Sequence, residues 1–150
     1  MRAILIDESG REARNDPSRA NTRFGFKLKE GEELSKDEAI ERLSKLWFEV
    51  QGERFSPGLG YFMLDVSLRF SPELAHRWLR LSLGLDQLAS WGVVAGKLDE
   101  KTPRDIILLM DTFVRRRLKS EGLWPMCKHW WTNRANRARD RAVKWSQAGG

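Results

Sequence analysis

Three side chains near the N-terminus have the types and spacing for acid-assisted bond cleavage. Glu8, Asp16 and Thr22 stand eight and then six positions apart in the stretch ILIDESGREARNDPSRANTRFG. Cleaving a glycosidic bond needs a carboxylic acid that protonates the leaving oxygen, and a second polar group that holds water or stabilises the cationic centre. Burial against the apolar residues 4–6 would raise the pKa of Glu8 and keep it protonated for that task. The triple therefore indicates a candidate catalytic cleft.

The same residues also have a plainer interpretation. In a chain with 21 acidic residues, such a triple arises readily by chance. Glu8 and Asp16 would then be solvated acids, and Asp16 with Pro17 would begin a turn. Even in a cleft, Glu12 and Asp65 compete with Asp16 for the place of the second carboxylate. The residue types alone leave both interpretations open.

The elements that must position these residues are helices with well-marked starts. Ser35 and Glu38 form a capping-box pattern ahead of a helix predicted over residues 36–50. On a later helix, Tyr61 and Asp65 lie four residues apart and therefore share one side, where they line a cleft or simply pack. Three further helices are predicted to begin where serine or threonine precedes proline, at Ser56, Ser71 and Thr102.

The remaining segments are less regular. Residues 91–100, WGVVAGKLDE, contain two glycines and are expected to form a connection. Residues 131–145 are mostly basic and predict a surface helix with a narrow apolar seam. The seam residues are Trp131, Ala135, Ala138, Ala142 and Trp145. Apolar and polar residues alternate in RFGFKLKEG, which predicts a short β-hairpin near residues 22–30. The expected class is mainly α, in one domain.

Charge and composition narrow the classes of function. The chain of 150 residues carries a net charge of +6, and residues 113–145 hold ten Lys and Arg against two acids. Such a patch favours a polyanionic partner, whether nucleic acid, acidic membrane or an anionic cell-wall polymer. No recognised nucleic-acid motif accompanies it, which disfavours that partner. One cysteine and two histidines form no cluster with metal-ligand spacing, so we expect neither metal nor cofactor.

Several motifs, in order, resemble those of the glycoside hydrolase 108 family, phage and bacterial muramidases with a peptidoglycan-binding region after the catalytic part. ILIDESGR, NDP and TRFGF resemble the family's Glu-Gly-Gly-Tyr, Asn-Asp-Pro and Thr-Asn-x-Gly-Ile segments. LSKDEAIERLSKLWFEV, SPGLGYFMLDVSLRFSPELAHRWLRLSLG, WGVVAGKLDEKT, FVRRRL and WWTNRANRARDRA resemble its later segments. The chain departs from the family pattern at Ser9, Arg11, Arg19 and Arg69, where the family has glycine, an aromatic residue or Asn.

The resemblance implies a lysozyme-like single-domain helical bundle. Residues 1–85 would form the catalytic region, and residues 86–150 a peptidoglycan-binding-like helical region packed on it as one compact unit. The implied activity is cleavage of the β-1,4 bond between N-acetylmuramic acid and N-acetylglucosamine. Glu8 would be the general acid, assisted by Asp16 and Thr22. Substrate-binding residues are expected at four positions: Phe24, Tyr61, Asp65 and Arg69.

Two other functions remain open at this stage. One is a catalytically inactive peptidoglycan-binding or phage-particle protein of the same fold, and the other is a basic nucleic-acid-binding protein. The expected partners are glycan strands of peptidoglycan and, for a particle component, phage tail proteins. MRAILIDESG has no signal-peptide pattern, and no run approaches the roughly 20 apolar residues of a membrane span. We therefore expect synthesis in the cytoplasm without membrane insertion, and action at the periplasmic wall after holin release or within a virion.

Overall fold

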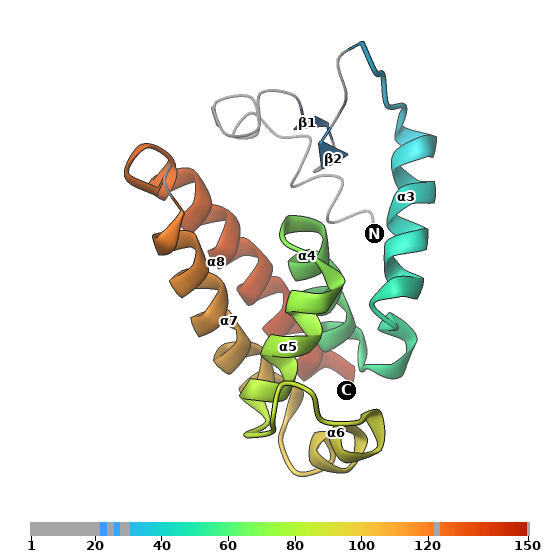
Figure 1. The fold of residues 1–150 in the computed structure, drawn as a ribbon, viewed down its shortest axis with the longest axis vertical. Helices are drawn as coiled ribbons and strands as arrows, with labels where there is room; N and C mark the ends of the chain where they lie inside the picture. The colour runs from blue at the N-terminus through green and yellow to red at the C-terminus, as the bar shows by residue number, and fades with distance from the viewer. Residues whose placement is uncertain (1–21, 24–25, 28–30, 122–123, 150) are drawn as a thin grey trace.

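The computed structural model describes residues 22–23, 26–27, 31–121 and 124–149 of the chain, and most of them are helical (Figure 1). The helices are α3 (Lys36–Glu49), α4 (Pro57–Arg69), α5 (Pro72–Ser82), α6 (Trp91–Leu98), α7 (Pro103–Ser120) and α8 (Trp124–Gly149), with a short 3-10 turn, η2 (Gly52–Arg54). Before them, β1 (Thr22–Arg23) pairs antiparallel with β2 (Phe26–Lys27), as expected for a short hairpin. The mainly α class is confirmed.

Local capping chemistry explains where three of the helices begin. Ser35 Oγ accepts a hydrogen bond from the backbone N–H of Glu38 at 3.1 Å, and Glu38 Oε1 accepts one from the N–H of Ser35. Ser71 and Thr102 cap α5 and α7 in the same manner, through their hydroxyl oxygens. Each cap satisfies a backbone donor that the first helical turn leaves unpaired. The predicted capping box and two of the predicted caps are thereby confirmed.

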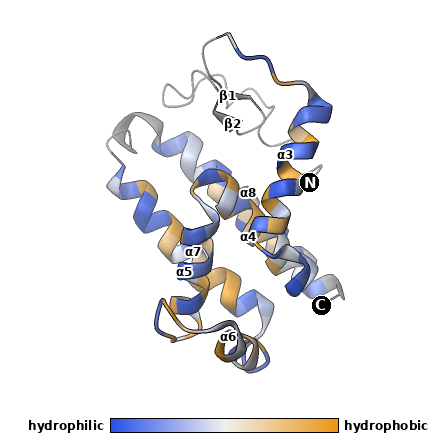
Figure 2. Ribbon diagram, turned by 45° about the vertical axis from the view of Figure 1, so that its right-hand side comes forward, coloured by the Kyte–Doolittle hydropathy of each residue, from blue (hydrophilic) through white to orange (hydrophobic). Residues whose placement is uncertain are grey.

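Helix α4 lies at the centre of the bundle. Every residue from Gly58 to Ser67 is buried, because α4 packs against α5, α7 and α8 on different sides. Helix α7 shows the pattern of a peripheral helix, with hydrophobic and hydrophilic residues on different sides of its axis (Figure 2). The buried core draws residues from both sides of residue 85, so regions 1–85 and 86–150 share it.

The structure corrects two expectations about the C-terminal half. Residues 91–98 form helix α6 rather than a connection, and α6 is anchored by buried Val94 and by Trp91, whose ring meets Phe55 edge-on. Helix α8 has the exposed face expected of a surface helix, but it packs closely on α4 and α7 and fully buries Arg134, which was not expected. Its apolar seam is confirmed from Trp131 to Ala142, whereas Trp145 is 38% exposed. Within the described residues, no helix is both long and apolar enough to cross a bilayer.

Candidate functional site

The described part of the chain contains three of the seven predicted site residues with their side chains. Glu8, Asp16 and Phe24 lie outside the described residues, and Thr22 is described only as backbone within β1. The other three, Tyr61, Asp65 and Arg69, follow one another at intervals of four residues along α4. This spacing brings them to one side of the helix, where α8 crosses.

Small residues allow α4 and α8 to approach each other closely. A Cβ atom built on Gly58 would lie 2.5 Å from the carbonyl oxygen of Ala142 and 2.6 Å from the backbone nitrogen of Ser146. Ala135 and Ala138 continue the narrow surface of α8, each with 1% exposure. The two helices therefore touch nearly backbone to backbone at one end, and long polar side chains fill the interface towards the other end.

A buried charge cluster occupies this interface. Arg134 Nη2 donates a hydrogen bond to Asp65 Oδ1 at 2.5 Å, and Arg69 Nη1 lies 3.8 Å from Asp65 Oδ2. The three side chains are 0%, 1% and 6% exposed for Arg134, Asp65 and Arg69 respectively. Charges removed from water are tolerated only when they are paired. Asp65 therefore serves both guanidinium groups within this interface.

Tyr61 is enclosed by the C-terminal part of α8. Arg141 Nη1 donates to its hydroxyl oxygen at 3.4 Å, and the Arg141 guanidinium carbon lies 5.9 Å from the centre of its ring. Trp145 meets the same ring nearly edge-on, with 4.9 Å between centroids. Only 4% of Tyr61 is exposed. The hydroxyl is therefore paired with Arg141 in the interior.

Burial changes the roles expected for Tyr61 and Asp65. Both were expected to contact a sugar, and Asp65 also competed for the place of the second carboxylate. Their side chains are covered by α8, so a polymer in solution cannot reach them in this conformation. In this structure they are packing residues: Asp65 pairs with Arg69 and Arg134, and Tyr61 contacts Arg141 and Trp145.

A second charged cluster joins α7 to α8 and was not foreseen from the sequence. Asp111, 5% exposed, accepts a hydrogen bond from Arg115 Nε at 2.6 Å and lies 4.0 Å from Arg139 Nη1. Arg115 Nη2 also donates to Asn136 Oδ1 at 2.7 Å. Part of the basic patch therefore stabilises helix packing. An acidic residue on an apolar helical face, such as Asp65 or Asp111, was the available signal that cations from another helix must be near.

The remainder of the basic patch is exposed to solvent. These exposed cations are Arg116, Arg117, Lys119, Lys128 and Lys144. Arg117 is partly neutralised, because its Nε lies 3.3 Å from Glu121. Over the described residues, no group of three or more His, Cys, Asp or Glu side chains is arranged to hold a metal ion.

Comparison with known proteins identifies the architecture. No family model matches the sequence, and no curated protein matches it. The structure is similar to that of SagA from Brucella abortus, with a TM-score of 0.82 and 22% sequence identity. The match covers 98% of this chain and 93% of that chain. At this level of identity the likeness establishes a shared fold, which extends over nearly the whole chain.

Proposed function

We propose that the protein is a peptidoglycan hydrolase, an N-acetylmuramidase that cuts the β-1,4 bond between N-acetylmuramic acid and N-acetylglucosamine. The supporting observation is the contact between two distant family-like segments. SPGLGYFMLDVSLRF and WTNRANRARDRA are packed against each other, and their polar residues pair as Asp65 with Arg134 and Tyr61 with Arg141. In a chance resemblance, residues of the two motifs would have no reason to contact each other. Their direct contact here favours the resemblance to the family.

The proposed chemistry rests on the N-terminal residues. Glu8 would protonate the leaving glycosidic oxygen, and Asp16 with Thr22 would hold the attacking water or stabilise the developing cation. The exposed cations on α7 and α8 would attract the carboxylates of peptidoglycan stem peptides. Such attraction between exposed charges is weakened by salt. Binding to the wall should therefore weaken with ionic strength more than the chemical step does.

A second candidate is a catalytically inactive relative that binds peptidoglycan or serves as a phage-particle component. The observation that favours it is the burial of Tyr61 and Asp65, which removes two of the four expected sugar contacts from the surface. A third expected contact, Arg69, replaces the family's Asn and has a side chain with only 6% exposure. A protein that keeps the helical framework but has lost the reaction would show the same packing.

Purified Gram-negative sacculi discriminate between the two candidates. Wild type, Glu8→Gln and a control, Glu41→Gln, would be compared for turbidity loss and release of reducing sugars at pH 4 to 8. Glu41 is an exposed acid on α3, so its loss should leave activity intact. We expect clearing by wild type and by the control, and none by Glu8→Gln with an unchanged circular dichroism spectrum. Binding of sacculi by wild type without clearing at any pH would favour the inactive relative.

A further inference from the structure

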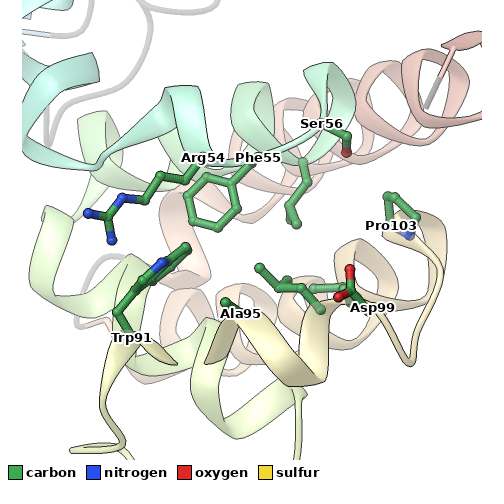
Figure 3. A pocket seen from close by; sticks show the side chains of 10 residues that line it. Arg54, Phe55, Ser56, Trp91, Ala95, Asp99 and Pro103 are labelled. Carbon is green, nitrogen blue, oxygen red and sulfur yellow. The ribbon is translucent and has the colours of Figure 1, made fainter. Parts of the chain in front are cut away.

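A groove separate from the α4 and α8 interface lies where η2 and the start of α4 face α6 and the start of α7 (Figure 3). Its volume is about 380 Å³, within the range of small-ligand sites. The floor is apolar: Leu59 and Ile106 are buried, and Ala95 and Leu98 line the α6 side. Phe55, Ala95 and Leu98 are only half-buried, and they supply the apolar surface that a seated ligand would cover.

One end of the groove carries a positive charge on an aromatic support. The guanidinium carbon of Arg54 lies 4.5 Å from the centre of the Trp91 ring, and Phe55 meets that ring edge-on. Stacking of this kind occupies the face of a guanidinium and leaves its N–H edge free for a carboxylate. Within the described part of the chain, the Arg54 side chain has no acidic partner.

The opposite end carries a buried hydroxyl and an exposed carboxylate. Asp99 lies beside Ser56 and Pro103 at this end, whereas Arg54 and Trp91 stand at the other (Figure 3). Ser56 precedes α4 as its cap residue, but its hydroxyl makes no capping bond. The hydroxyl oxygen is buried and has no hydrogen-bond partner within the described residues. Among the described residues, the Asp99 carboxylate also has no partner. Buried polar atoms are normally paired, so the Ser56 hydroxyl indicates a missing donor, whereas Asp99 is exposed and supplies a negative charge at this end of the groove.

The two ends are separated by a defined length. Trp91 begins α6 and Asp99 caps its C-terminus, eight residues later. At 1.5 Å per residue, this interval corresponds to about 12 Å along the helix axis. An extended tripeptide spans about 10 to 11 Å between its ends. The midpoint is occupied by Ala95, whose small side chain leaves the groove open.

We propose that this groove binds a short zwitterionic peptide of about three residues, with its carboxylate on Arg54, its ammonium group on Asp99 and Ser56, and its side chains over Leu59 and Ile106. Charge complementarity at both ends sets its direction. The apolar floor favours small aliphatic side chains rather than charged ones. The inference does not depend on the glycan-cleaving reaction, because no residue of the groove belongs to the proposed catalytic set.

Trialanine is the probe, and full-length isotope-labelled protein is the target. Titration followed by NMR should shift amide signals around Trp91, Ala95 and Asp99. N-acetyl-trialanine and trialanine amide each remove one terminal charge and should bind about tenfold more weakly. Asp99→Asn should weaken the binding of trialanine about tenfold but leave the binding of N-acetyl-trialanine unchanged. Arg54→Gln should weaken the binding of trialanine by a similar factor but leave the binding of trialanine amide unchanged.

Two neighbouring positions on α6 provide a matched pair of variants. Ala95→Leu should fill the groove and abolish the shifts, whereas Gly96→Ala should bind as wild type does, because a Cβ there meets no atom within 4 Å. The absence of amide shifts at trialanine concentrations up to about 10 mM would overturn the proposal. Equal binding of the free and blocked peptides would overturn it as well, since the groove would then take apolar ligands without reading either charge.

Discussion

Arg134 of α8 is fully buried and donates a 2.5 Å hydrogen bond to Asp65 of α4, 69 positions earlier in the chain. The pair closes the interface between the central helix and the C-terminal helix. Because Arg69 stands on the other side of the carboxylate, Asp65 serves two cations at once. Its loss would leave both guanidinium groups without that carboxylate in a site that excludes water.

Asp65→Asn should therefore be strongly destabilising. Removing one partner of a buried ion pair typically costs about 3–5 kcal/mol, because the remaining charge loses a partner that water cannot replace. The free energy of unfolding, measured by urea denaturation, should fall by that order. The exposed pair of Lys97 and Glu100 is the control, and Glu100→Gln should cost less than about 1 kcal/mol. A similar small effect at both sites would show that Asp65 contributes no special stability.

Gly58→Ala should separate α4 from α8. The new methyl group would lie 2.5 Å from the backbone of Ala142, which cannot give way as a flexible side chain can. Overpacking of this kind typically costs about 1–3 kcal/mol. The matched change Gly96→Ala adds a methyl group in open space within α6, and should instead stabilise by about 0.5–1 kcal/mol. Thermal denaturation of the two variants should thus shift in opposite directions, and equal shifts would contradict the close contact.

His76 makes stability sensitive to mild acid. Burial lowers the pKa of His76 below its ordinary 6.5, against the raising effect of its hydrogen bond to Val50, and Arg80 and Arg54 lower it further. Because the folded state resists protonation, the unfolded chain binds more protons as pH falls through 6.5. The contribution of His76 to the free energy of unfolding is therefore fully present above pH 6.5. It is lost progressively as the pH falls from 6.5 to the pKa of His76 in the folded state.

The pH effect can be isolated with the two histidines of the chain. Urea midpoints at pH 7.5 and pH 5.0 should differ less in His76→Gln than in wild type. His129 is exposed, and His129→Gln should keep the wild-type difference. If His129→Gln reduced the difference and His76→Gln did not, the assignment to His76 would be wrong.

Tyr61→Phe tests whether Tyr61 is a packing residue rather than a sugar contact. The variant removes a hydroxyl that pairs with Arg141 in the interior but keeps the ring that packs on Trp145. Sacculus hydrolysis should proceed at the wild-type rate with the same KM, while stability falls by about 1 kcal/mol. A raised KM with unchanged stability would restore a direct role in substrate binding.

The helix starts that were predicted correctly depend on interactions between residues close together in the sequence. The capping box at Ser35 and the caps at Ser71 and Thr102 depend on atoms within three residues, so their patterns were sufficient. Helix α6 was missed because its two glycines weaken helix propensity, and packing of Trp91 on Phe55 compensates for that weakness.

Long-range contacts explain what the sequence could not predict. A basic helix reads as a surface helix, and nothing near Arg134 in the chain indicates that its partner is Asp65. The groove is likewise invisible in the sequence, since its walls come from separate segments around Arg54, Ala95 and Ile106. For the proposed catalytic set at Glu8, Asp16 and Thr22, the resemblance in residue types and order remains the supporting argument.

Product identity tests the central claim most directly. Sacculi digested by wild type would be reduced with borohydride and analysed by mass spectrometry to identify the sugar at each new reducing end. We expect fragments that end in reduced N-acetylmuramic acid, and their absence with folded Glu8→Gln. New ends of reduced N-acetylglucosamine, no new ends at all from wild type, or equal products from wild type and Glu8→Gln would contradict a muramidase that uses Glu8 as its acid.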